Sequence, residues 1–198
     1  MTGGRVGLVV ALVVLAGCGG LAPEAGDGPG PRGTAASLPE DTTRVSVTAV
    51  VDGDTIRVEY RNGTRDTVRL VGVDTPEVHA ESAPAEFEGV PETSDGVQCL
   101  RTWGDRASAF TRDHLAGEQV RVSFDANEGR RGGYGRLLVY VHHDGRLFNH
   151  RLVEEGYARV YDSEFTKRER FYATEERVQS QGVGLWSCRD GGTASDSG

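Results

Sequence analysis

Short segments rich in β-branched residues, separated by tight-turn residues, place the strongest constraint on the fold. Residues 44–51 alternate apolar and polar positions, and the apolar ones are Val45, Val47, Ala49 and Val51. This period of two predicts a half-buried strand. Asp52-Gly53-Asp54 interrupts the pattern, residues 55–60 resume it, and Asn62-Gly63 marks a second tight turn before residues 67–73. We therefore expect a meander of three strands.

The segments that follow add two strands and three helices. Helical spacing predicts helices over residues 103–115, 148–156 and 164–181, with Asn149 as a candidate N-cap of the second. Two further strands are expected at residues 119–124 and 137–142. This order predicts an α+β fold that is mainly β: a five-stranded OB-fold-like barrel with three helices.

Residues 78–100 show no clear period and are expected to form a long loop. The stretch contains no Lys or Arg but several acidic residues, namely Glu81, Glu86, Glu88, Glu92 and Asp95. It follows the turn Asp74-Thr75-Pro76, where proline lacks the backbone donor that a sheet requires. The loop should therefore begin where the third strand ends.

The first 17 residues have the composition of an export signal. Arg5 precedes an apolar run, residues 6–16, that is too short to span a bilayer comfortably. Leu15-Ala16-Gly17-Cys18 resembles a lipobox, in which Cys18 becomes N-terminal and lipid-modified. An ordinary signal peptide cut nearby is the alternative. We expect an exported protein, anchored to the membrane at the cell surface by lipid on Cys18 or released from it.

Composition divides the chain into four regions. Residues 1–17 are the predicted lipoprotein-type signal peptide, and residues 18–43 a flexible tether rich in Gly, Pro and acids. Residues 44–188 have the length of one domain, and residues 189–198 form a polar tail that we expect to be disordered.

The chain contains three cysteines. If Cys18 carries lipid, Cys99 and Cys188 remain as a pair that is able to form a disulfide outside the cell. Two free thiols are the alternative. No spacing of cysteine and histidine in the sequence is typical of a zinc site.

The charge balance is acidic. The formal net charge is −8, and the chain without residues 1–17 carries 21 basic against 30 acidic residues. Lys167 is the only lysine. This composition argues against a broad cationic surface for duplex DNA, because such binding depends on many phosphate contacts. Any recognition of phosphate must therefore be local.

Three short motifs carry the candidate chemistry: Asp52-Gly53-Asp54-Thr55, the segment from Arg69 to Glu77, and Tyr134-Gly135-Arg136. Asp54 begins one predicted strand and Asp74 ends another, so sheet pairing is able to bring the two carboxylates together around a hard cation. Glu77 follows the same turn, within reach of such an ion. Taken singly, Asp54 would be a turn residue and Glu77 one more acid in an acidic loop.

Two arginines complete the set. Arg69 lies between apolar neighbours in a predicted strand, where an unpaired charge is costly. The guanidiniums of Arg69 and Arg136 are planar, permanently charged and able to bind two oxygens of a phosphate. A structural ion pair is the alternative for Arg69, and an ordinary surface position for Arg136. Together the motifs supply what cleavage of a phosphodiester bond requires.

In sequence and order these motifs resemble the staphylococcal nuclease (thermonuclease) family. The resemblance spans residues 45–186 and includes Ala107-Ser108-Ala109-Phe110-Thr111 and Gly184-Leu185-Trp186. It implies that Asp54, Asp74 and the Thr75 carbonyl bind Ca2+. It also implies that Arg69 and Arg136 bind the scissile phosphate, and that Glu77 orients or deprotonates the attacking water.

The resemblance further implies a monomeric, calcium-dependent nuclease for DNA and RNA. We expect little sequence preference, a preference for single strands, and 3′-phosphate products. Tyr134 matches an aromatic residue of the family's nucleotide site. Tyr161 is the nearest counterpart of a second one, although Asp162 occupies its register. Gly133 stands where the family often has lysine.

Two alternatives share this resemblance. One is a nuclease-like fold kept as a non-catalytic module that binds nucleic acid or protein, and the other is a calcium-binding surface lipoprotein without enzymatic function. Degenerate domains of the first kind typically lose the metal carboxylates or the arginines. Because the carboxylates and both arginines are present here, the sequence favours the enzyme.

Overall fold

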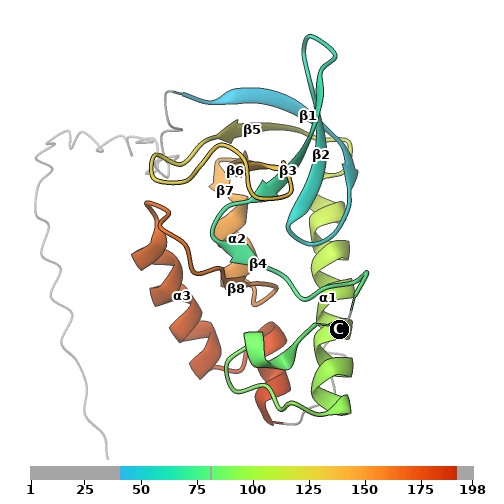
Figure 1. Cartoon of the computed structure of the whole chain (residues 1–198), viewed down its shortest axis with the longest axis vertical. Coiled ribbons are helices and arrows are strands. Elements are labelled where there is room, and N and C mark those ends of the chain that lie inside the picture. The colour runs from blue at the N-terminus through green and yellow to red at the C-terminus, as the bar shows by residue number, and fades with distance from the viewer. Residues whose placement is uncertain (1–40, 81, 191–198) are drawn as a thin grey trace, which may run out of the picture. The chain divides into compact units, whose positions relative to one another are not determined.

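The computed structural model describes residues 41–80 and 82–190. The predicted signal peptide, Cys18 and most of the predicted tether lie outside the described residues, and so do residues 191–198 of the predicted tail. Within the described part, runs of consecutive strands are separated by helices, and the helices lie outside the barrel (Figure 1).

Five strands form the barrel: β1 (Thr43–Val50), β2 (Thr55–Tyr60), β3 (Arg65–Leu70), β5 (Gln119–Ser123) and β6 (Leu137–His143). They pair in the order β3-β2-β1-β5-β6, and a parallel pairing between β3 and β6 closes the sheet on itself. β7 (Arg146–Leu147) extends β6 as a hairpin. The prediction of a five-stranded OB-fold-like barrel is confirmed.

The helical segments surround this barrel. They are η1 (Pro84–Glu86), α1 (Ser94–Leu115), α2 (Phe148–Glu154), α3 (Arg168–Ser180) and η2 (Gly184–Asp190). In Figure 1, α1 and α3 lie on opposite sides of the view, with a small sheet of β4 (Val73–Asp74) and β8 (Arg159–Val160) between them. Among the described residues, no helix has the length and hydropathy needed to cross a bilayer.

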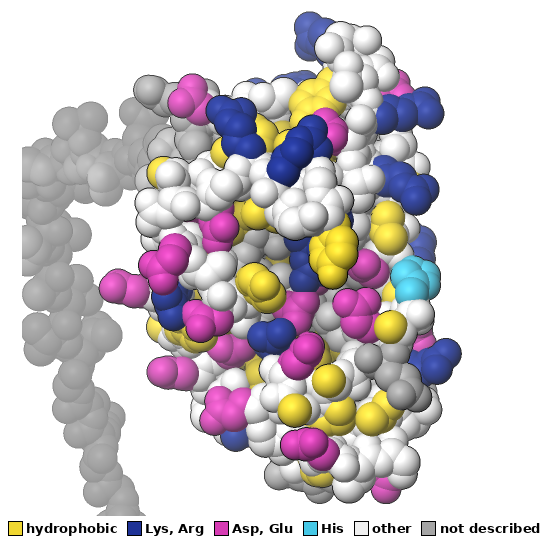
Figure 2. All heavy atoms as spheres, in the orientation of Figure 1, with side chains coloured by type: hydrophobic (Ala, Val, Ile, Leu, Met, Phe, Trp, Pro, Cys, Tyr) yellow, Lys and Arg dark blue, Asp and Glu magenta, His cyan; other side chains and the backbone are white. Residues whose placement is uncertain are grey.

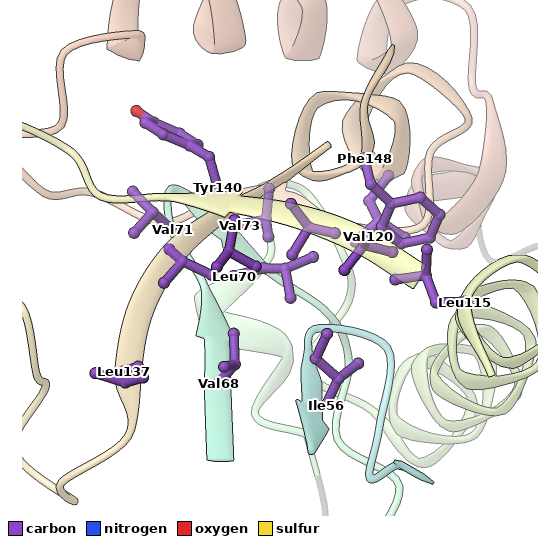
Figure 3. Close-up of a cluster of buried hydrophobic side chains, with 14 of the residues drawn as sticks. Ile56, Val68, Leu70, Val71, Val73, Leu115, Val120, Leu137, Tyr140 and Phe148 are labelled. Atoms are coloured by element: carbon purple, nitrogen blue, oxygen red, sulfur yellow. The ribbon is translucent and has the colours of Figure 1, made fainter. Parts of the chain in front are cut away.

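The barrel is filled by branched apolar side chains, as the alternation in the sequence predicts. Ile56, Val68 and Leu70 point into the interior from β2 and β3 and meet side chains of β5, β6 and the helices (Figure 3). Each fully buried side chain of this kind contributes roughly 1.5–3 kcal/mol. Val45 and Val47 are buried as expected, but a β-bulge between Val47 and Ala49 shifts the register, and Ala49 is only half-buried.

Helix α1 begins at Ser94, well before the predicted start at residue 103, so the second half of the predicted loop is helical. The side chain of Thr93 caps the helix by accepting a hydrogen bond from the Gly96 N–H at 3.3 Å. The first turns show no clear helical period in the sequence, because their burial depends on contacts with distant segments. Cys99 and Leu100 belong to a second apolar cluster, completed by Phe87, Val90, Val178, Leu185, Trp186 and Cys188.

The predicted third strand, residues 67–73, is broken in two. β3 ends at Leu70, and the chain turns at Gly72, whose φ of +75° favours glycine. β4 then pairs with β8 rather than with the barrel.

The prediction that Asn149 caps α2 is wrong. The helix has no side-chain cap, and Asn149 is fully buried. Its side chain accepts from the Val141 N–H at 2.8 Å and donates to the carbonyls of Val71 (2.9 Å) and Val139 (3.1 Å). Asn149 therefore ties α2 to β6 and to the turn between β3 and β4.

Candidate active site

Asp54 lies at the buried entrance to β2, and its side chain is only 1% exposed. One carboxylate oxygen accepts a hydrogen bond from the Thr75 N–H at 2.8 Å, and the other accepts one from the Thr55 hydroxyl at 3.1 Å. Burial raises the pKa of Asp54; Arg69 opposes the rise, and the charges of Asp52 and Asp74 add to it. The site therefore favours a positive charge close to this carboxylate.

Two glycines allow the backbone to approach closely at this point. A Cβ on Gly53 would lie 2.7 Å from Thr75 and 2.8 Å from Ala107, and one on Gly104 of α1 would lie 2.6 Å from the Pro76 carbonyl oxygen. The turn that carries Thr75 and Pro76 is consequently held between the β1–β2 turn and α1.

A single guanidinium joins the two predicted metal-binding carboxylates. Arg69 donates from Nη1 to Asp54 and from Nη2 to Asp74. The β2–β3 ladder sets this arrangement, because Arg69 pairs with Thr55, next to Asp54. Burial lowers the pKa of Arg69, but the two carboxylates raise it by more, so its net shift is upward. The structure thus brings Asp54, Asp74, Thr75 and Arg69 together.

Arg159 is a second cation at this centre, and our sequence reasoning missed it. It stands opposite Asp74 in the β4–β8 pair, and its guanidinium lies 2.7 Å from Asp74 Oδ2 and 3.8 Å from Glu86. The feature that singled out Arg69, an arginine between two apolar neighbours, is also present at Arg159, which lies between the buried residues Ala158 and Val160. Asp52, whose carboxylate accepts from the Asp54 N–H at 3.2 Å, was likewise not assigned.

Glu175 of α3 holds β8 in place, and its raised pKa makes the free energy of unfolding depend on pH. Its carboxylate accepts from the Val160 N–H at 2.7 Å, and burial raises its pKa to about 6 from 4.5. An acid whose pKa is raised by folding favours the folded state while protonated, and this contribution is lost as pH rises from about 4.5 to about 6.

A Glu175→Gln variant should therefore gain stability relative to wild type as pH is raised from about 4.5 to about 7.5, by about 2 kcal/mol. Glutamine keeps an acceptor for Val160 and removes the charge. The measurement is urea unfolding of both proteins across this pH range. A stability difference that does not change with pH would contradict this assignment.

Glu77 lies on the exposed segment after the Thr75-Pro76 turn. Its backbone N–H donates to the Ser82 hydroxyl at 2.7 Å, and His79 Nε2 lies 3.3 Å from the Val51 carbonyl oxygen. These contacts fix the segment against the turn that carries Asp54. The Glu77 side chain is solvent-accessible and able to meet a substrate.

Two cavities flank the ridge formed by Tyr134 and Arg136. The first, of about 430 Å³, is lined by Arg69, Glu77, Tyr134, Arg136 and Tyr161, and we call it the tyrosine pocket. The second, of about 1050 Å³, shares Glu77, Tyr134 and Arg136 with the first and extends over β1, β2 and β3; we call it the strand groove. Tyr134 is 91% exposed and Tyr161 50% exposed. Such aromatic faces are available for stacking on bases.

Arg136 is coupled to the buried centre through one hydroxyl. Its Nη1 donates to Thr55 Oγ1 at 3.3 Å, and that hydroxyl in turn donates to Asp54. The Arg136 guanidinium also lies 5.6 Å from the centre of the Tyr134 ring. The structure therefore places Arg136 and Glu77 at the mouth of the site and Arg69 at its base.

The remaining predicted residues lie elsewhere. Cys99 and Cys188 are joined by a disulfide in the second apolar cluster. Asp162, in the register of the family's second tyrosine, pairs with Arg168 at 2.6 Å. Within residues 41–80 and 82–190, no three His, Cys, Asp or Glu side chains are arranged to hold a metal ion. The site offers two carboxylates bridged by arginine, with the Thr75 backbone beside them.

Fold and site together define a class: an OB-type barrel with several arginines gathered beside two carboxylates at the end of its strands. A family model described as staphylococcal nuclease homologue matches residues 67–188. The chain is also 34% identical over 143 residues to a thermonuclease of Staphylococcus hyicus, a match that covers 71% of this chain and 74% of that protein. The chain belongs to the staphylococcal nuclease family.

Other relatives extend this likeness. An uncharacterized protein of Methanocaldococcus jannaschii is 38% identical over 148 residues, covering 71% of this chain and 70% of that protein. An endonuclease of Bacillus subtilis is 34% identical over 146 residues, covering 72% of this chain and 61% of that protein. Family membership supports a nuclease, and hence a hydrolase, function.

Proposed function

We propose that this protein is a calcium-dependent nuclease that hydrolyses phosphodiester bonds of DNA and RNA with little sequence preference, leaving 3′-phosphate ends. The observation that carries the proposal is the convergence of Asp54 and Asp74 on Arg69, at the base of a pocket whose mouth holds Glu77 and Arg136. Thermonuclease and endonuclease relatives support it.

The donor set suits calcium. Carboxylate and carbonyl oxygens are the ligands that this ion prefers, and Asp54, Asp74 and the Thr75 carbonyl would supply them. Burial raises the pKa of the Asp54 carboxyl, and a divalent cation bound beside it would favour its charged form. Bound there, Ca2+ would neutralise charge that develops on the phosphate oxygens.

The chain's own residues divide the remaining work. Arg69 uses one donor of each terminal nitrogen for carboxylates. Among the described residues no further hydrogen bond occupies its other donors, which are therefore available to the phosphate. Arg136 binds the same group from the ridge and stabilises the extra charge of the transition state. Glu77 orients or deprotonates the water that attacks phosphorus. The P–O5′ bond breaks as the new P–O bond forms, and the leaving 5′-oxygen takes up a proton that Glu77 returns through solvent.

Weak sequence preference follows from the character of the pocket. Tyr134 and Tyr161 present ring faces, which stack on any base. The arginines contact phosphate, which carries no sequence information. Two exposed aromatic rings suit unpaired bases, so we expect single strands to be preferred.

For location we propose an exported monomer held at the cell surface by lipid on Cys18, with residues 18–43 as a tether and residues 44–188 as the catalytic domain. The disulfide supports this proposal, because such bonds persist in oxidising compartments.

Digestion of plasmid DNA, single-stranded DNA and RNA, with Ca2+ and with EGTA, tests the function. We expect cleavage of all three polymers with Ca2+, fastest for single strands, and loss of cleavage to background with EGTA. End-group analysis should find 3′-phosphates. Binding without cleavage would favour a non-catalytic module, and cleavage that survives EGTA would overturn the calcium assignment.

A further inference from the structure

The strand groove has no role in the mechanism above, although it meets the site directly. It lies on the outer face of β1, β2 and β3 and shares Glu77, Tyr134 and Arg136 with the tyrosine pocket. A polynucleotide whose scissile phosphate is bound at this ridge continues in both directions. The part of the strand on one side of the scissile phosphate would enter the tyrosine pocket, and the part on the other side would meet the strand groove.

A row of side chains across three strands forms part of the groove. Arg57 of β2 pairs with Ala49 of β1 on one side and with Thr67 of β3 on the other. All three line the groove, and Arg57 is exposed. Both of its neighbours have small side chains, which leaves room for a ligand beside the exposed Arg57.

The charges that line the groove leave two guanidiniums, Arg57 and Arg136, against one carboxylate, Glu77. Arg65 is paired with Glu59 at 2.6 Å, and the Asp66 carboxylate is neutralised by Arg131 at 2.9 Å. Within the part of the chain that the structure describes, neither Arg57 nor Arg136 forms an ion pair with a carboxylate. In the view of Figure 2, basic side chains are more frequent toward the barrel strands and acidic ones toward α3. The groove therefore carries a small local excess of positive charge on an acidic protein.

We propose that the strand groove binds the part of a single-stranded nucleic acid that lies beyond the scissile phosphate, opposite the part in the tyrosine pocket, with Arg57 binding its phosphates. The proposal rests on the nuclease function proposed above. In OB-type barrels the face of strands 2 and 3 commonly receives oligonucleotides, and here that face bears the groove. Tyr134 on the shared ridge is placed to stack on a base as the strand crosses.

The test compares Arg57→Ala with wild type on two substrates: a single-stranded 20-mer of deoxythymidylate and thymidine 5′-(4-nitrophenyl phosphate), which carries one nucleoside only. We expect KM for the 20-mer to rise roughly tenfold, as for loss of one charged hydrogen bond, with kcat/KM for the aryl ester unchanged. The slope of log KM against log salt concentration should fall by about 0.7, the value for one phosphate contact of a single strand.

Two variants serve as controls. Arg57→Lys keeps the charge and should recover most of the affinity for the 20-mer. Arg112→Ala removes an exposed arginine of α1 that lines neither cavity, and it should leave both substrates unaffected. Circular dichroism and thermal unfolding establish that each variant is folded.

The outcomes separate this inference from the proposed function. If wild type cleaves the 20-mer and Arg57→Ala does so with the same KM and salt slope, the groove assignment is wrong and the nuclease function stands. If wild type cleaves neither substrate, the proposed function fails. In that case, fluorescence anisotropy of a labelled 20-mer with Ca2+ tests the groove assignment. The assignment requires that Arg57→Ala bind the 20-mer more weakly than wild type does.

Discussion

An Arg69→Lys variant is expected to lose about two to three orders of magnitude in kcat, with a much smaller change in KM for single-stranded DNA. Arg69 bridges Asp54 and Asp74 with two nitrogens at once and keeps further donors for the phosphate. Lysine retains the charge but has one nitrogen and no planar fork. It is therefore unable to hold both carboxylates and a phosphate in one geometry.

Arg69→Ala should add a loss of stability to this loss of rate. Asp54, 1% exposed, would keep its buried carboxylate without the guanidinium, a change that costs about 3–5 kcal/mol for a buried pair. Because the proposed Ca2+ would neutralise the same two carboxylates as Arg69, Ca2+ should raise the unfolding midpoint of Arg69→Ala more than that of wild type.

Initial rates over a range of substrate concentrations, together with urea unfolding with and without Ca2+, measure both effects. Arg136→Ala is the matched control for Arg69→Ala, because Arg136 contacts Asp54 through the Thr55 hydroxyl and its loss should affect rate without the same loss of stability. Full activity in Arg69→Ala would contradict the role assigned to this residue.

The barrel could be predicted from the sequence because the signals that mark its strands are local. Alternation and turn residues mark β1, β2, β5 and β6 directly. The same turns carry Asp54 and Asp74, so the position of the site followed from the strand order. The bond between Cys99 and Cys188 followed from counting cysteines once Cys18 was assigned to lipid.

What the sequence did not predict depends on contacts between distant segments. β4 and β8 have two residues each, too few to show a period, and their pairing brings Arg159 to Asp74. The early start of α1 depends on burial of Cys99 and Leu100 against the C-terminal segment. Asn149 was misread as a cap because its three backbone partners lie on other elements.

The second large effect concerns stability rather than catalysis. Replacing both cysteines of the disulfide, Cys99→Ala with Cys188→Ala, should lower the free energy of unfolding by about 4 kcal/mol. The bond closes a loop with a sequence separation of 89 residues, and its loss frees the unfolded chain. Both positions are buried, so alanine is preferred to serine, which would add an unsatisfied hydroxyl.

Urea unfolding of this double variant and of wild type, each with and without a reductant, measures the effect. Reduction should destabilise wild type and leave the variant unchanged, which separates the bond from the side chains. Below its unfolding midpoint the variant should keep most of its activity, because the barrel strands and the β4–β8 pair hold Asp54, Asp74 and Arg69.

A folded variant without activity would mean that the second apolar cluster, which contains the disulfide, also positions the site. The route would run through α1, where Gly104 contacts the Pro76 carbonyl and so supports the segment that carries Glu77. In that case KM for substrate should remain near its wild-type value while kcat falls, because Glu77 acts on the water and the arginines bind the phosphate.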